Sequence, residues 1–153
     1  MIIAIGSLYN VVMECPVCKE PMLVIEYEGI ELDLCDACHG VWLDEGELEL
    51  LLGDHEMTHG FLTAGNPAAA KKEESRPCPI CDAVMGKAVT GGKTPVVYDY
   101  CPHEHGLWFD RGELLSILEQ GSSDGAAAAV VQWLRHVFPD SSTPQTKQET
   151  LNP

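Results

Sequence analysis

Basic residues are scarce in this chain of 153 residues, where nine Lys and Arg stand against 24 acidic residues and the formal net charge is −15. The few basic residues form no stripe of the kind that binds a phosphate backbone. The acidic field instead repels nucleic acid and anionic lipid surfaces at long range. This composition argues against unaided nucleic-acid binding, and it favours solubility and basic protein partners.

The N-terminal residues 1–12 lack the features of a targeting segment. They are apolar in places, but they have neither the basic start nor the clear cleavage site of a secretory signal. They are also too short to cross a bilayer. We therefore expect a cytoplasmic protein, in which paired cysteines indicate metal sites rather than disulfides. Because Met13 could itself begin translation, we expect residues 1–12 to be an added edge strand or a mis-assigned start.

Two parts of the chain repeat one sequence unit. Residues 35–52 and 101–118 align without gaps and are identical at nine of eighteen positions. A Cys-Pro-x-Cys pair precedes each of them, at 15–18 and at 78–81. Self-similarity of this kind indicates a duplicated structural unit. The expected organisation is an N-terminal extension (1–12), a first unit (13–53), a linker (54–75), a second unit (76–121), a C-terminal amphipathic helix (122–139) and a disordered tail (140–153).

Each unit has the pattern of a β-hairpin followed by a short helix. Apolar residues alternate with polar ones before the third cysteine position, at 30–34 and 96–100, as in a half-buried strand. Leucines at helical spacing follow at 48–52, and the second unit repeats the spacing at 114–118.

The segment between hairpin and helix has an Asp-x-x-Glu pattern in both units. It resembles a capping box, in which the side chain of Asp44 or Asp110 accepts from free amides of the helix and Glu47 or Glu113 reaches back. A last amphipathic helix is predicted near the C-terminus, with four apolar side chains on one face: Val130, Trp133, Leu134 and Val137.

The cysteines of the first unit have the spacing of a zinc site. C-x₂-C, sixteen residues, then C-x₂-C brings two tight turns to one end of a hairpin, where four sulfurs can form a tetrahedron. The predicted ligands are Cys15, Cys18, Cys35 and Cys38. Disulfides are disfavoured by the compartment, and a [4Fe–4S] cluster by the spacing. Since each unit has only some 40–45 residues, zinc binding is expected to be part of folding.

The second unit supplies three matching cysteines, Cys78, Cys81 and Cys101. Glu104 replaces the fourth cysteine and lies between His103 and His105, so three side chains compete for the last position. We assign it to His105, because imidazole reaches further than a thiolate and zinc among thiolates favours nitrogen over carboxylate. His103 and Glu104 remain alternatives.

The motif C-P-x-C … C-x-x-C-H-G-x-W-L-D-x-G-E-L resembles the bacterial and archaeal zinc ribbons named after transcription factor IIB. Both halves carry it, over 13–53 and 76–120. The resemblance implies zinc binding and a ribbon fold in both halves. With the C-terminal helix predicted from its apolar spacing, we expect a small metal-stabilised α+β protein of two tandem zinc ribbons with two Zn²⁺ per chain. The resemblance implies no biochemical role, because fold does not fix function. Trp42 and Trp108 are expected to cover the metal sites and to join each helix to its hairpin.

A different zinc motif, H-E-x-x-H, occurs at His55-Glu56-Met57-Thr58-His59. On a helix both histidines would share a face and Glu56 would act as a general base, as in zinc peptidases. Some twenty residues between the units leave little scaffold for a third ligand and a cleft, and Gly53 and Gly60 interrupt a helix. We interpret the motif as a polar segment after the first helix.

These observations favour a non-enzymatic zinc-binding adaptor that contacts other proteins through its acidic first unit and its C-terminal helix, unless that helix packs on its own units. The alternative is a transcription-associated protein that binds nucleic acid. Its candidate surface lies in the second unit: Arg76, Lys87, Lys93 and Arg111, beside Tyr98, Tyr100 and Trp108.

Overall fold

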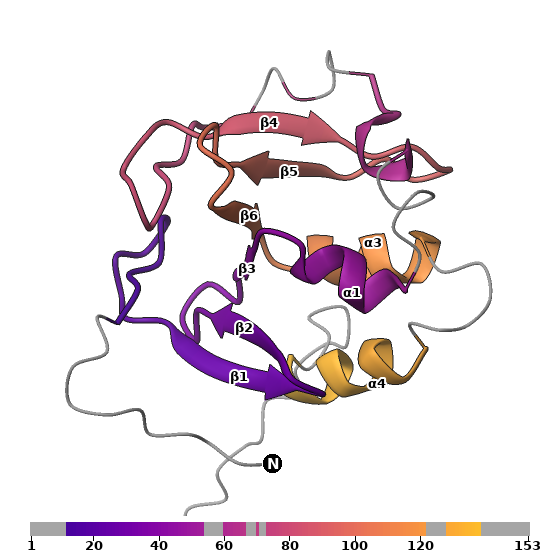
Figure 1. The fold of residues 1–153 in the computed structure, drawn as a ribbon, viewed down its shortest axis with the longest axis horizontal. Coiled ribbons are helices and arrows are strands. Elements are labelled where there is room, and N and C mark those ends of the chain that lie inside the picture. The colour runs from indigo at the N-terminus through magenta and orange to yellow at the C-terminus, as the bar shows by residue number, and fades with distance from the viewer. Residues whose placement is uncertain (1–11, 54–59, 67–69, 71–72, 122–127, 139–153) are drawn as a thin grey trace, which may run out of the picture.

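A single antiparallel sheet organises the structure, a computed structural model that describes residues 12–53, 60–66, 70, 73–121 and 128–138. In this part of the chain the sheet has six strands in the order β1-β2-β3-β6-β5-β4 (Figure 1). The strands are β1 (Leu23–Tyr27), β2 (Ile30–Leu34), β3 (Val41–Asp44), β4 (Gly86–Val89), β5 (Val97–Tyr100) and β6 (Gly106–Phe109). The helices are α1 (Glu47–Leu52), α3 (Glu113–Gly121) and α4 (Ala128–Val137).

Each repeat forms three strands rather than the expected hairpin alone. We call residues 13–53 the N-terminal unit, with β1, β2, β3 and α1, and residues 76–121 the C-terminal unit, with β4, β5, β6 and α3. The third strands β3 and β6 pair with each other, so that Trp42 lies opposite Trp108. An unpaired strand edge is a liability that folded proteins cover. Here each unit covers the other's edge, and the two units share one sheet.

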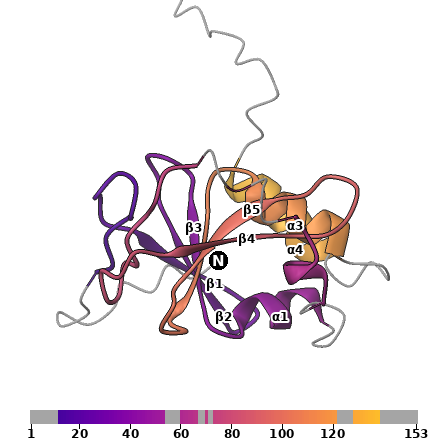
Figure 2. The same ribbon diagram turned by 90° about the horizontal axis from the view of Figure 1, so that it is seen from above.

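One face of the sheet carries the helices and the main apolar core. Figures 1 and 2 show α1, α3 and α4 gathered on the same side of the sheet. Side chains of β2 and β3 alternate, so that Leu32, Leu34 and Leu43 enter this core while Asp33 and Trp42 face the other side. The opposite face therefore holds a separate cluster of the cysteines, both buried tryptophans and two methionines.

The C-terminal helix α4 lies within the predicted range and uses its apolar face inside the molecule. Val130, Val131 and Leu134 are buried in the core. The ring of Trp133 lies 5.0 Å from that of Tyr27 on β1. In the described residues, no helix is long and apolar enough to cross a bilayer. The structure thus places α4 against its own units, and leaves its apolar stripe unavailable to a partner.

The predicted capping boxes form only in part. Glu47 reaches back as expected, accepting the amide of Asp44 at 2.8 Å, and Glu113 does the same for Asp110 at 2.7 Å. Asp44, however, does not cap α1. Asp44 ends strand β3, and its Oδ1 accepts the indole N–H of Trp42 at 3.0 Å, while Gly46 is the cap residue of α1 and makes no side-chain bond. The carboxylate oxygen of Asp44 that was expected to accept from the helix amides instead accepts from the indole of Trp42.

The described residues between the two units pack against the C-terminal unit and do more than connect the two. Leu62 is buried in the main core, and its carbonyl accepts the hydroxyl of Tyr98 at 3.1 Å. The amide of Gly65 donates to the carbonyl of Val89 on β4 at 2.9 Å. This segment covers the C-terminal unit, and it has no counterpart among the described residues of the N-terminal unit.

Candidate metal centres

Four loops carry the candidate metal ligands, and all four close in the same way. In each, the amide of the first cysteine donates to the carbonyl five residues later: Cys15 to Glu20 at 2.8 Å, Cys35 to Gly40 at 3.0 Å, Cys78 to Ala83 at 2.8 Å and Cys101 to Gly106 at 3.0 Å. Amides inside the loops point at the first sulfur, as from Cys18 to Cys15 at 3.3 Å. Such donors stabilise the thiolate form that a metal requires.

The first cluster brings all four predicted cysteines of the N-terminal unit together. Their sulfurs lie within 4.8 Å of one another, and Cys15 Sγ and Cys38 Sγ are 3.6 Å apart. Sulfurs about 2.3 Å from a tetrahedral zinc ion are separated by about 3.8 Å. The donor set and its spacing therefore fit Zn²⁺.

The second cluster joins Cys78, Cys81 and Cys101 with His105, again within 4.8 Å of one another. Cys81 Sγ lies 3.7 Å from Cys101 Sγ, which in turn lies 3.4 Å from Nδ1 of His105. Three thiolates and an imidazole are an established zinc donor set. The two clusters can therefore bind two zinc ions per chain.

A change in one turn explains why a histidine can replace a cysteine in the second cluster. In the other three loops the residue four after the first cysteine is left-handed, and its amide bonds to that cysteine, as His39 does to Cys35 at 2.8 Å. In the fourth loop the left-handed residue is Glu104, one position earlier, and its amide bonds to Cys101 at 3.1 Å. The tighter turn leaves Glu104 exposed, while His105 is half-buried at the cluster.

His103 lies near the same cluster without joining it. Its Nδ1 is 3.4 Å from Cys81 Sγ, but its side chain is exposed and it is not one of the four mutually close donors. Of the three alternatives for the fourth ligand, the geometry thus favours His105.

The thiols of each cluster differ in acidity. Burial raises the pKa of Cys101, but the amides of His105 and His103 and the neighbouring thiols outweigh it and lower the value to about 6. Burial raises the pKa of Cys78 to about 11, despite opposing amide bonds. Metal binding must release protons from such groups, so zinc affinity depends on pH.

The two tryptophans interlock the units beside the clusters. A Cβ added at Gly40 would lie 2.1 Å from Cζ2 of Trp108, and one added at Gly106 would lie 2.6 Å from Cζ2 of Trp42. Each indole therefore packs on the glycine of the other unit, and both are fully buried. Their expected role beside the metal sites is refined here: they join unit to unit.

A single row of paired residues crosses the sheet on this face. Its members, in strand order, are Val24, Asp33, Trp42, Trp108, Asp99 and Lys87. The row is symmetric about the tryptophans except at its ends, where Val24 corresponds to Lys87. The predictions from sequence do not single out either aspartate, and Lys87 is expected on a nucleic-acid surface rather than paired with Asp99. The signal was present, since an Asp stands two residues before the third cysteine position in each repeat.

Carboxylates flank the row in both units, and burial shifts their pKa values. Burial, then Asp44 and Glu31, raise the pKa of Asp33 to about 6. Burial, with repulsion from Asp44 and Asp33, likewise raises the pKa of Glu47 to about 7. In the C-terminal unit burial raises the pKa of Glu113 to about 8.

The candidate nucleic-acid surface of the second unit does not form a stacking platform. Tyr98 and Trp108 are buried, at 4 % and 0 % exposed. Lys87 is paired with Asp99 and Glu73, at 2.7 and 3.3 Å. The H-E-x-x-H motif at 55–59 lies outside the described residues apart from its flanking Gly60.

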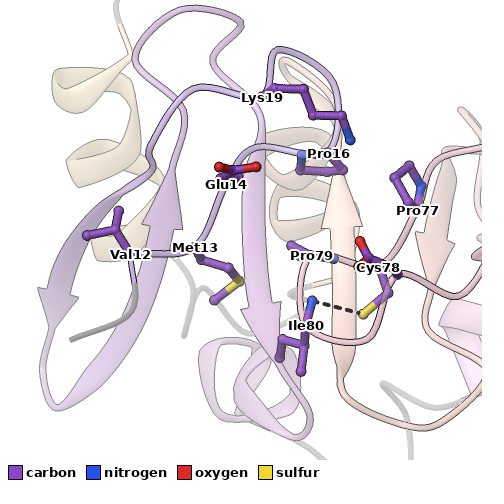
Figure 3. A pocket seen from close by; sticks show the side chains of 10 residues that line it. Val12, Met13, Glu14, Pro16, Lys19, Pro77, Cys78, Pro79 and Ile80 are labelled. Atoms are coloured by element: carbon purple, nitrogen blue, oxygen red, sulfur yellow. Dashed lines mark hydrogen bonds between the residues drawn. The ribbon is translucent and has the colours of Figure 1, made fainter. Parts of the chain in front are cut away.

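A pocket of about 490 Å³ lies where the first loops of the two units come side by side (Figure 3). Its walls are apolar apart from Glu14, Lys19 and Asp82. The lining residues are Val12, Met13, Glu14, Pro16 and Lys19 from one unit and Pro77, Cys78, Pro79, Ile80 and Asp82 from the other. These groups offer no set of donors converging on one point.

Comparison with known proteins identifies the first unit alone. Residues 14–53 match the family model of the TFIIB-type zinc ribbon, described as a transcription factor zinc-finger. The matched range contains all four cysteines of the first cluster. No curated protein and no solved structure matches the chain.

Proposed function

We propose that the protein is a non-enzymatic, cytoplasmic zinc-binding adaptor, made of two tandem zinc ribbons, that works through protein–protein contacts. The second unit supports the tandem arrangement, because its strand order, loop closure and donor cluster repeat those of the first. In this proposal Cys78, Cys81, Cys101 and His105 hold the second zinc ion.

The observation that carries the adaptor function is the charge of the N-terminal unit. Residues 13–60 hold thirteen acidic residues and one lysine. Two of the acids, Glu26 and Glu31, share a face of the sheet with Val24, which is 48 % exposed, while Leu23, 56 % exposed, lies on the opposite face. Acidic side chains around an exposed apolar one suit a basic protein partner. Since α4 packs on its own units, the contact surface we propose is this unit alone.

Nucleic-acid binding is the second candidate, and the family description motivates it. The basic and aromatic groups left exposed for it are few: Lys93, Arg111 and Tyr100, the last 41 % exposed. A role in transcription through contact with another protein would fall within the adaptor proposal.

The test uses the zinc-loaded full chain as bait after nuclease treatment. Protein partners that a Glu26→Gln/Glu31→Gln variant no longer binds, but a Glu14→Gln/Glu20→Gln control still binds, would support the adaptor. Both variants remove two charges from the same unit, and only the first removes them from its strands.

A mobility shift of DNA or RNA at low salt that weakens as salt rises would favour the second candidate. Peptidase activity lost in Glu56→Gln would refute the non-enzymatic proposal.

A further inference from the structure

In the C-terminal unit a buried aspartate, Asp99, is paired with a lysine. Asp99 is fully buried on β5, and Oδ1 lies 2.7 Å from the ammonium of Lys87 on the adjacent edge strand β4. Glu73, from the segment before the unit, binds the same ammonium at 3.3 Å. A buried carboxylate is tolerated when a cation pairs with it.

The equivalent aspartate of the N-terminal unit has no such cation. Asp33 is 7 % exposed, and within the described part of the chain its side chain has no hydrogen-bond or ion-pair partner. The cross-strand residue that corresponds to Lys87 is Val24. The charged neighbours of Asp33 are the carboxylates Glu31, Asp44 and Glu47. The N-terminal unit thus has the buried aspartate of the C-terminal unit but lacks the lysine that pairs with it there.

No described strand pairs with the outer side of β1, the edge strand beside Asp33. Among the described residues β1 pairs with β2 alone, so its outer edge has free backbone donors and acceptors. On the face that carries Asp33, β1 presents Val24 and Glu26, and β2 presents Glu31. Both glutamates are exposed. An added strand would find hydrogen-bond partners along its backbone and carboxylates on one face.

We propose that the outer edge of β1 is the docking site for an extended segment of a basic partner protein, with Lys or Arg at alternate positions reaching across Val24 to Asp33. This inference rests on the adaptor function proposed above and names the chemistry of its partner.

The geometry allows this reach. A strand added to β1 lies two strand spacings, roughly 10 Å, from β2. A lysine or arginine side chain spans most of that distance, with its stem lying along the exposed side chain of Val24 and its charge at Asp33. Side chains of one face recur every second residue, so alternate basic residues would also meet Glu26 and Glu31. A second copy of this chain is a poor occupant, because its β1 brings Glu26, and no basic residue, to the same edge.

The test measures binding of a labelled (Lys-Thr)₅ peptide to the zinc-loaded full chain by fluorescence anisotropy. The control peptide, Lys₅Thr₅, has the same composition and charge without the alternation. We expect the alternating peptide to bind about tenfold more tightly, and Asp33→Asn to remove most of that preference. Glu20→Gln, which removes one exposed charge outside the strands, should leave it intact.

The Val24→Lys variant tests whether a loss of peptide binding comes from a filled Asp33 site or from a damaged fold. It supplies the internal ammonium that the C-terminal unit has, so we expect a higher Tm, two zinc ions still bound, and loss of alternating-peptide preference. A variant that was merely misfolded would lose Tm and zinc together.

Four results would overturn the inference, and the last of them would leave the adaptor function standing. One is equal affinity for both peptides. Another is a dimer in sedimentation that Val24→Lys dissociates, which would make a second copy the occupant. The third is peptide binding only after removal of residues 1–11, which would make those residues the occupant. Nuclease-resistant partners that still bind Val24→Lys would leave the adaptor function standing and refute this docking site.

Discussion

Gly40→Ala tests the interlock between the two units. An added Cβ would lie 2.1 and 2.3 Å from Cζ2 and Cη2 of Trp108. Carbon atoms pack best about 3.5–4.0 Å apart, so the indole would have to retreat by about 1.5 Å. The backbone of Gly40 is not in the left-handed region, so the substitution acts through this contact and not through backbone strain.

The indole has little freedom to retreat. Trp108 is fully buried, and its Nε1 donates to Asp110 at 3.0 Å. Overpacking a filled site costs about 1–3 kcal/mol, and weakening a bond to a carboxylate adds about 1 kcal/mol. We therefore expect a loss of about 3 kcal/mol. At about 4 °C per kcal/mol, the Tm should fall by about 10 °C.

The Tm of Gly40→Ala is measured by thermal unfolding followed by circular dichroism. Protein and zinc concentrations are held fixed, since bound metal shifts the Tm. Native mass spectrometry shows whether both zinc ions stay bound. Gly60→Ala is the matched control, because a Cβ there meets nothing within 4 Å. We expect its Tm to stay within about 2 °C of the wild type, the shift that about 0.5 kcal/mol gives.

A double-mutant cycle gives the sharper result. Phenylalanine lacks the outer atoms of the indole, so Gly40→Ala should cost less in a Trp108→Phe background. Gly106→Ala should show no such rescue by Trp42→Phe, because the backbone carbonyl of Leu43 also lies 2.3 Å from its added Cβ. If Gly40→Ala matches the Gly60→Ala control, or costs the same in both backgrounds, the interlock is wrong.

Three further predictions concern metal, pH and the C-terminal helix. His105→Ala should lower the zinc count in native mass spectrometry from two to one, whereas His103→Ala should leave it at two; the opposite result would reverse the ligand assignment. The pKa of Glu113 is raised to about 8, so its protonated form favours the fold at low pH, and this contribution is lost as pH rises through about 8. Glu113→Gln keeps an acceptor for the cap without the charge, so its Tm should exceed the wild-type value at pH 9 and match it near pH 5; an equal difference at both would refute this reasoning. Trp133→Ala removes the ring packed on Tyr27 and should cost about 2 kcal/mol, with faster amide exchange throughout 128–137; unchanged exchange there would show that α4 does not depend on this contact.

The parts of the fold that local patterns encode were predictable from the sequence. Cysteine spacing predicted which sulfurs meet, and alternation and helical spacing predicted β2, β5 and the three described helices. The choice of His105 followed from side-chain length, but its structural basis, the turn shifted to Glu104, had no signal in composition or period.

What escaped prediction depends on contacts between distant residues. The sequence predicts no strand at Val41–Asp44, because four residues carry too little pattern to identify one. Its pairing with β6 is set by the meeting of two edges, which neither repeat encodes alone. The failed side-chain cap has the same origin: Asp44 is a good cap residue until an indole two residues earlier takes its oxygen.

The two repeats differ most at positions that make no structural contact common to both units. Their identical residues include three of the four cysteines, the glycines under the indoles and the glutamates that reach back to the strand ends, and each has a structural contact in both units. The positions of Glu26 and Glu31, by contrast, are Val89 and Val97 in the C-terminal unit, where the segment containing Gly65 lies against β4. A unit selected for stability alone would gain by pairing Asp33 with a lysine, as the other unit pairs Asp99. Asp33 has carboxylates and no cation around it among the described residues, so a cation supplied from outside the chain would stabilise its charge. The asymmetry of the repeats is therefore what the docking site proposed above requires: it lies at the β1 edge rather than at the metal clusters.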